Sequence, residues 1–269
     1  MNDRTKKRFF LLIAGSVGTL LASTSFAADA STPATATATI DWSKLQISVT
    51  GVDGTTPTVN FSGQNSSLNS YAQSPGQYES NSKSLDNWTE TAQVTSDAGT
   101  AFANGLASQT DFSGTANSTL GGYSNFSGSR TESFSFSGPG ILTITVPYTI
   151  SLTDTTSTCY YCYNDDHASV SGHASFYSYA NNGSSSSNSD VSYSLSNNYF
   201  ETSPQSQSGT LVFGIFANGP GDGSLSLNFD AGINVSSIPE PESYAMLLAG
   251  LGLMGAVVRR RVKAERSLQ

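Results

Sequence analysis

The sequence predicts an all-β protein whose central part, residues 39–236, folds as a single antiparallel β-sandwich of the jelly-roll-like kind. Apolar and polar side chains alternate in several short segments, as in strands with one buried face. Gly, Pro and Asn cluster between these segments, as in turns. Ser, Thr, Asn and Gly dominate the polar positions and Leu is sparse, which favours strands over helices. The two ends differ, and we expect a signal helix before the sandwich and a hydrophobic helix after it.

The clearest strand is "ILTITVPYTISLT", residues 141–153. Its large apolar residues all share one parity, so one face of the strand should be buried and the other should show Thr and Ser to water. These residues are Leu142, Ile144, Val146, Tyr148, Ile150 and Leu152. Pro147 has the opposite parity and no backbone N–H, so it predicts an edge position or a bulge.

Further strands are predicted from the same alternation in residues 39–51, 132–138, 190–195, 209–219 and 224–236. Turn sequences separate them at 137–140, 181–183 and 218–223. The segment 53–130 is less regular, and Trp88, Val94, Phe102 and Leu106 suit either strands of the same sheets or a short helix; strands are favoured. Residues 28–38, "ADASTPATATA", contain only small side chains apart from Asp29, and predict a flexible leader.

The charge distribution excludes one class of partner. Residues 28–238 contain only three basic residues, Lys44, Lys83 and Arg130, whereas sixteen of the acidic residues of the chain lie there. Such an acidic body repels phosphate backbones, so nucleic acid is not expected to bind.

The N-terminus has the layout of a secretory signal peptide, residues 1–27. Four bases at Arg4, Lys6, Lys7 and Arg8 precede an uncharged run, and Ser25-Phe26-Ala27 places small residues at a cleavage site after Ala27 or Ala28. The alternative, a buried helix, does not explain an apolar run without a polar face directly behind four bases.

Residues 237–269 combine Pro239-Glu240-Pro241, an uncharged run from Tyr244 to Val258, and the cluster Arg259, Arg260 and Arg261. A helix rises about 1.5 Å per residue and a bilayer core is about 30 Å thick, so the run is short for a permanent span. The arginines should stay on the cytoplasmic side.

These three parts, in this order, resemble a PEP-CTERM sorting signal. The resemblance implies export by a Gram-negative bacterium that makes extracellular polysaccharide. It also implies processing near the Pro-Glu-Pro by an exosortase at the inner membrane, so that the helix is a transient anchor and the tail is removed. A plain C-terminal transmembrane anchor is the alternative.

Cys159 and Cys162 are the only cysteines, and in an exported protein they predict a disulfide that closes a short loop. Free thiols, a redox pair and a zinc site remain alternatives. The zinc site would add His167 and His173, but six residues of strand would hold the two histidines about 20 Å apart. No metal or cofactor is therefore expected. Calcium at Asn164-Asp165-Asp166, or at Asp222 between its glycines, is an alternative to solvated turns.

The sequence predicts no enzyme. There is no Gly-x-Ser-x-Gly motif. Pairs among Glu79, Glu90, Glu132 and Glu201 could in principle hydrolyse glycosides, but no spacing singles out a pair.

Aromatic residues around the cysteines are candidates for sugar binding. Tyr160, Tyr161 and Tyr163 lie beside Asp165 and Asp166, and rings with nearby carboxylates are typical of sugar-binding faces. The alternative is packing within strands, which applies equally to the downstream Tyr177, Tyr179, Tyr193 and Tyr199.

The function predicted from these features is that of an exported protein of the cell surface or extracellular matrix, structural or adhesive within exopolysaccharide and biofilm. Its expected partners are the exosortase, the inner membrane during sorting, and extracellular polysaccharide. A carbohydrate-binding module and a secreted hydrolase are the alternatives.

Overall fold

The computed structural model describes residues 33–52, 54–119, 121–153, 166–180, 183–197, 204–235 and 246–255. The predicted signal peptide, residues 1–27, lies outside the described residues, as do both cysteines and the Pro-Glu-Pro triplet.

The described chain between residues 33 and 235 is built from strands, with one 3₁₀ turn, η1 (Trp42–Lys44), between the first two. The strands are β1 (Ala34–Ile40), β2 (Gln46–Gly51), β3 (Val59–Ser74), β4 (Gln77–Leu85), β5 (Ala92–Asp97), β6 (Ala101–Ala107), β7 (Phe112–Ser118), β8 (Tyr123–Phe136), β9 (Gly140–Thr153), β10 (His167–Ala180), β11 (Gly183–Ser196), β12 (Gln205–Ala217) and β13 (Gly221–Asn234). Five of them, β3 to β7, lie within residues 53–130 and β8 begins there, so the strands favoured for that segment are confirmed.

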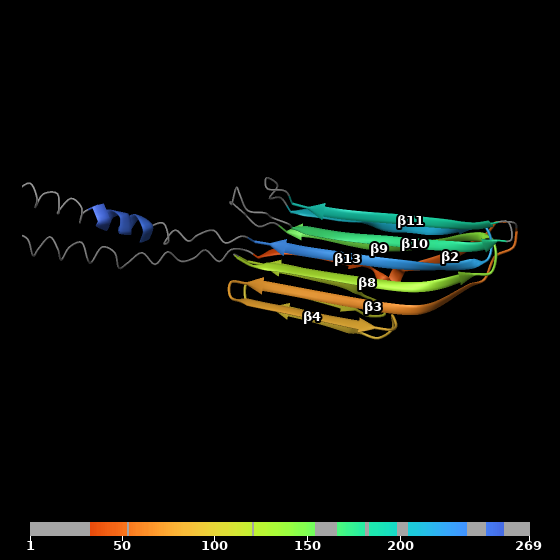
Figure 1. The fold of residues 1–269 in the computed structure, drawn as a ribbon, viewed down its shortest axis with the longest axis horizontal. Helices are drawn as coiled ribbons and strands as arrows, with labels where there is room; N and C mark the ends of the chain where they lie inside the picture. Colours follow the sequence, from red (N-terminus) through yellow and green to blue (C-terminus); the bar gives the residue numbers. More distant parts are fainter. Residues whose placement is uncertain are drawn as a thin grey trace, which may run out of the picture. The chain divides into compact units, whose positions relative to one another are not determined.

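The strands form two antiparallel sheets, which confirms the all-β sandwich. Sheet A has the order β12-β9-β1-β7-β6-β5, and β2 also pairs with β9. Sheet B has the order β11-β10-β13-β8-β3-β4, and Figure 1 shows these six strands side by side. Many strands that are neighbours in sequence lie in different sheets. The chain passes from one sheet to the other between β2 and β3, β4 and β5, β7 and β8, β8 and β9, β9 and β10, β11 and β12, and β12 and β13.

The alternation predicted for β9 is confirmed. All six apolar residues of the shared parity are buried, and the opposite face carries Thr and Ser. Pro147 lies where β1 and β2, which both pair with β9, are separated by η1. Its carbonyl accepts a hydrogen bond from the Asp41 N–H (2.9 Å). In an antiparallel strand the N–H and C=O of one residue point to the same side, so an N–H at position 147 would point toward the η1 stretch between β1 and β2. In the described structure no strand pairs with β9 on that side at this point, so the missing N–H of proline costs no hydrogen bond of the sheet.

The first strand corrects the prediction for residues 28–38. Residues 34–38 are not a flexible leader but belong to β1, and Ala34, Ala36 and Ala38 are fully buried. The sandwich therefore begins before residue 39. Alternating Ala and Thr give a weak hydrophobic pattern, which explains why the strand is not evident from sequence.

The inner face of sheet A is lined by small residues where aromatic rings from sheet B approach it. Gly105 and Gly114 face each other across β6 and β7, and a Cβ atom on either would lie 1.7 Å from the ring of Phe126 on β8. No side chain fits there, so the paired glycines form a slot for one ring. Phe229 stacks on Phe126, with ring centroids 5.1 Å apart, and meets Phe112 edge to face at 4.5 Å, which completes this part of the core.

The lateral edges of the two sheets are linked by side-chain hydrogen bonds. On one side, the Asn81 amide on β4 donates to the Thr95 carbonyl on β5 (2.6 Å). On the other, the N–H groups of Gly214 and Phe216 on β12 donate to hydroxyls of β11 (3.4 and 3.2 Å). These bonds occupy backbone groups that an edge strand would otherwise offer to another chain.

Residues 246–255 are helical, as expected for the hydrophobic run after the sandwich. In the described part of the chain no helix has the length and apolarity that crossing a membrane requires.

Candidate functional site: the outer face of sheet B

Short polar side chains stand in register on the outer face of sheet B. One row across the strands contains Ser171, Asn228, Ser129 and Ser67, and the next contains Ser169, Asp230, Ser127 and Asn69. We call these eight residues the polar face. Neighbours within a row are about 4.8 Å apart and rows about 6.7 Å apart, as strand geometry requires. The result is a regular array of hydroxyl, amide and carboxylate groups.

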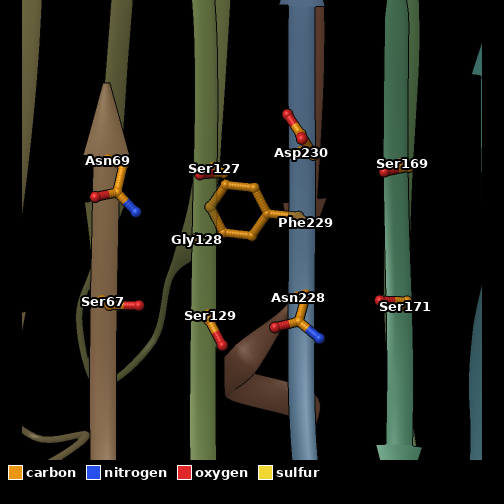
Figure 2. A pocket seen from close by; sticks show the side chains of 10 residues that line it. All are labelled: Ser67, Asn69, Ser127, Gly128, Ser129, Ser169, Ser171, Asn228, Phe229 and Asp230. Atoms are coloured by element: carbon orange, nitrogen blue, oxygen red, sulfur yellow. The ribbon is translucent and has the colours of Figure 1, made fainter. Parts of the chain in front are cut away.

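The polar face lines an open surface hollow of about 330 Å³. Figure 2 shows its side chains on four neighbouring strands, with the ring of Phe229 beside Gly128. A Cβ atom on Gly128 would lie 2.5 Å from that ring, so the glycine lets the buried ring lie close to the backbone of β8.

Most groups of the polar face are not engaged by the protein. Among the described residues, the side chains of Ser67, Asn69, Ser127, Ser129, Ser169, Ser171 and Asn228 make no hydrogen bond with one another or with other groups. They retain free donors and acceptors at the surface. Asp230 is the exception, since its Oδ1 accepts from the Asn125 amide (2.9 Å) and lies 3.3 Å from His167 Nε2.

A second hollow, of about 460 Å³, lies further along β10 on the same face. Tyr177 and Tyr179 line it, together with Asn188 of β11 and Asp222 of β13. Tyr177 stands between Ser186 and Asp222 in register. This hollow therefore combines aromatic rings with hydroxyl, amide and carboxylate groups.

Residues 237–261 match the family model of the PEP-CTERM protein-sorting motif. The chain carries a PEP-CTERM sorting signal. The match covers Pro239, Glu240, Pro241 and the three arginines 259–261. All six residues lie outside the described part of the structure. The PEP-CTERM motif implies an exported protein that an exosortase sorts at the membrane. Comparison of the chain with curated proteins and with solved structures finds no match.

The PEP-CTERM motif covers only the tail, so the function of the sandwich has to be inferred from the residues of the sandwich. Of the predicted sugar-binding set, Tyr160, Tyr161, Tyr163 and Asp165 lie outside the described residues, as do Cys159, Cys162 and Asn164.

Asp166 does not have the exposed position that sugar binding would need. Its side chain is buried, and its Oδ1 accepts a hydrogen bond from the Asn234 N–H (2.8 Å). Its own carbonyl accepts from the Asn197 N–H (3.1 Å). Asp166 therefore joins the start of β10 to the ends of β11 and β13.

The two histidines of the zinc alternative lie on the same strand, β10, and contact different carboxylates. His167 contacts Asp230, and His173 Nδ1 lies 2.6 Å from Asp190 Oδ1 across the β10–β11 pair. Among the described residues, no three His, Cys, Asp or Glu side chains come together as a metal site would require. Asp222, considered for calcium in a loop, belongs to β13.

The candidate carboxylates do not share a hollow. Glu132 is on the inner face of β8, where its Oε1 accepts from the Gln64 amide (2.8 Å), and burial raises its pKa. Glu79 is on the exposed strand β4 and accepts from the Asp97 N–H (2.8 Å). Neither lines either hollow, and Glu201 lies outside the described residues.

Sequence reasoning missed the polar face. Each of its strands shows Ser or Asn at alternate positions, which predicts only a wetted face. The rows arise from the pairing of segments far apart in the chain, such as Ser67 with Ser129, and no local signal specifies that pairing.

Proposed function

We propose that this protein is a non-enzymatic structural or adhesive component of an exopolysaccharide matrix, and that the polar face of sheet B is its adhesive surface. The proposal rests on one observation: hydroxyl and amide groups lie in register across the surface of sheet B and make no hydrogen bond within the described protein. Such groups can exchange bound water for the hydroxyls of a polysaccharide.

The chemistry of the surface favours a ligand that is rich in hydroxyls and carries no strong negative charge. The body contains sixteen acidic and three basic residues, so polyanions are repelled. Both hollows are shallow surface features and neither is lined by paired carboxylates. Adhesion by many weak contacts suits this arrangement better than turnover.

The sorting motif supplies the location in this proposal. Export places the sandwich outside the cytoplasm, and the exosortase releases it from the helix near the Pro-Glu-Pro. The mature protein then resides at the surface, or in the matrix, of a Gram-negative cell. Mass spectrometry of the surface and medium fractions should find a C-terminus close to Pro241 and no peptide containing Arg259. An intact arginine tail on the mature protein would contradict the processing step.

Adhesion is tested with the full-length gene expressed in its host and the mature protein purified from the cell surface. The variant Ser129→Glu/Ser171→Glu adds bulk and charge to the polar face, at positions separated by one strand. The matched control, Ser113→Glu/Thr149→Glu, adds the same charges to the outer face of sheet A, also separated by one strand.

We expect the sheet B variant to lose co-sedimentation with the neutral exopolysaccharide of the host by about tenfold and to form a looser matrix. The sheet A variant should behave as wild type. Equal binding by all three proteins would overturn the assignment of the face. Failure of the wild-type protein to co-sediment would overturn the adhesive function itself.

A further inference from the structure

Tyr177 and Tyr179 form an exposed pair of rings on the outer face of sheet B, unlike the pair of Tyr148 and Tyr193. Their rings meet edge to face, with centroids 5.0 Å apart and an interplanar angle of 75°. They are 45% and 63% exposed, and neither hydroxyl makes a hydrogen bond within the described protein.

The comparison with Tyr148 and Tyr193 makes the difference clear. Those rings stack at 4.8 Å with an angle of 17°, Tyr148 is buried, and its hydroxyl accepts from the Gln207 amide (3.0 Å). That pair fills the space between the sheets. Tyr177 and Tyr179 fill no space in the core, and exposed aromatic area next to a polar hollow is typical of ligand sites.

The residues around the two rings have short, polar side chains. In register, Tyr177 lies between Ser186 and Asp222, and Tyr179 opposite Ser184. Because these neighbours are short, the faces of the rings are not covered from the sides. Asn188 and Asp222 line the same hollow and offer an amide and a carboxylate beside the rings.

We propose that Tyr177 and Tyr179 form a stacking subsite for an uncharged polysaccharide of β-linked pyranoses. The C–H face of a sugar ring packs on the tyrosines, while Asn188 and Asp222 bond its hydroxyls. A β-linked glucan fits because its pyranose hydrogens are axial, so each ring presents flat C–H faces, and because it carries no charge for the acidic body to repel.

This inference rests on the proposed adhesive function and assigns it a ligand class and a site. The polar face begins six residues earlier on the same strand, at Ser171, about 20 Å away at the rise of a strand. A long extended chain lying along β10 therefore passes over both hollows.

The full-length gene is expressed in its host, and the test measures binding of the mature protein purified from the cell surface, by isothermal titration and affinity electrophoresis. The probes are a soluble β-1,4-glucan, a soluble β-1,3-glucan and alginate, a polyuronate. The variants are Tyr177→Ala/Tyr179→Ala and Tyr177→Phe/Tyr179→Phe. The matched control is Tyr78→Ala, because Tyr78 is 78% exposed on β4 of the same sheet and lines neither hollow.

We expect at least one β-glucan to bind, with an affinity insensitive to salt, and alginate not to bind. The double alanine variant should lose about tenfold or more in affinity, the phenylalanine variant should stay within about threefold, and Tyr78→Ala should be unchanged. All variants should unfold at the wild-type temperature, since the exchanged side chains are exposed.

The two proposals fail differently. If a glucan binds equally well to wild type and to Tyr177→Ala/Tyr179→Ala, the subsite is wrong and the adhesive function stands. If only alginate binds, or if Tyr78→Ala weakens binding as much as the double variant does, the subsite is likewise overturned. If the protein binds neither the glucans nor the polysaccharide of its host, both proposals fall.

Discussion

The guanidinium carbon of Arg130 lies 4.2 Å from the centroid of the Trp42 ring, and Arg130 is fully buried. Phe112 faces the same cation at 4.8 Å. The guanidinium donates from Nε to Ser66 Oγ (3.1 Å) and from Nη2 to the Ser108 carbonyl (2.7 Å). In the described structure its Nη1 has no partner. Burial lowers the pKa of Arg130 to about 10, so it remains charged at neutral pH inside a cage of aromatic rings.

Replacing Arg130 should show how much of its role is packing and how much is charge. Arg130→Ala leaves a cavity and an unpaired Ser108 carbonyl, and should reduce the free energy of unfolding by about 2 to 4 kcal/mol. Arg130→Met keeps most of the volume and removes the buried charge, so it should be more stable than the alanine variant by at least about 1 kcal/mol. Urea denaturation of both variants measures this. A methionine variant as unstable as the alanine variant would show that the cation itself is required.

Gly105→Ala and Gly114→Ala should each destabilise the sandwich by about 1 to 3 kcal/mol, because the new methyl group overlaps the Phe126 ring. Gly138→Ala is the control, since a Cβ there meets no atom within 4 Å. Adding Phe126→Leu to Gly105→Ala should recover part of the loss. Thermal unfolding of the four proteins gives the comparison, and equal losses at Gly105 and Gly138 would contradict the slot.

Glu132 predicts a pH dependence of stability. Burial raises its pKa in the folded protein, so the folded state binds its proton more tightly than the unfolded state does. Protonation of Glu132 therefore contributes to the free energy of unfolding. This contribution is fully present below the pKa that Glu132 has in the unfolded chain, and it is lost as the pH rises through the pKa in the folded protein. Glu132→Gln keeps an acceptor for Gln64 without the charge. The variant should be more stable than wild type at pH 8, and the difference should shrink toward pH 4; a constant difference would argue against this titration.

Asp166→Ala should lower the free energy of unfolding by about 1 to 3 kcal/mol, since the Asn234 N–H loses its acceptor in a buried place. Asp166→Asn retains an oxygen acceptor and should lose less. Neither variant should change the affinity for polysaccharide while it remains folded. A folded Asp166→Asn protein with lost binding would restore Asp166 as a ligand contact.

Cys159 and Cys162 predict a disulfide in the exported protein. A thiol reagent added to the unreduced, unfolded protein should label no cysteine, and labelling should appear only after reduction. Labelling of both residues before reduction would support the free-thiol alternative.

Local pattern determined much of this protein. The period-two alternation in residues 141–153 predicts which face of β9 is buried, because side chains of a strand alternate between its two faces wherever the strand is placed. The order Pro-Glu-Pro, apolar run and arginines identifies the sorting signal, because a sorting enzyme reads contiguous sequence.

Only the tertiary structure decided the rest. Ala34 and Gly105 carry almost no hydrophobic signal, yet Ala34 is fully buried and Gly105 lies where the Phe126 ring of the other sheet leaves no room for a side chain. Arg130 is the one basic residue that the fold buries among those described, because its aromatic and hydroxyl neighbours come from distant segments. The polar face depends on the lateral order of strands, and that order is set by pairings between remote residues, which an alternating pattern permits but does not specify.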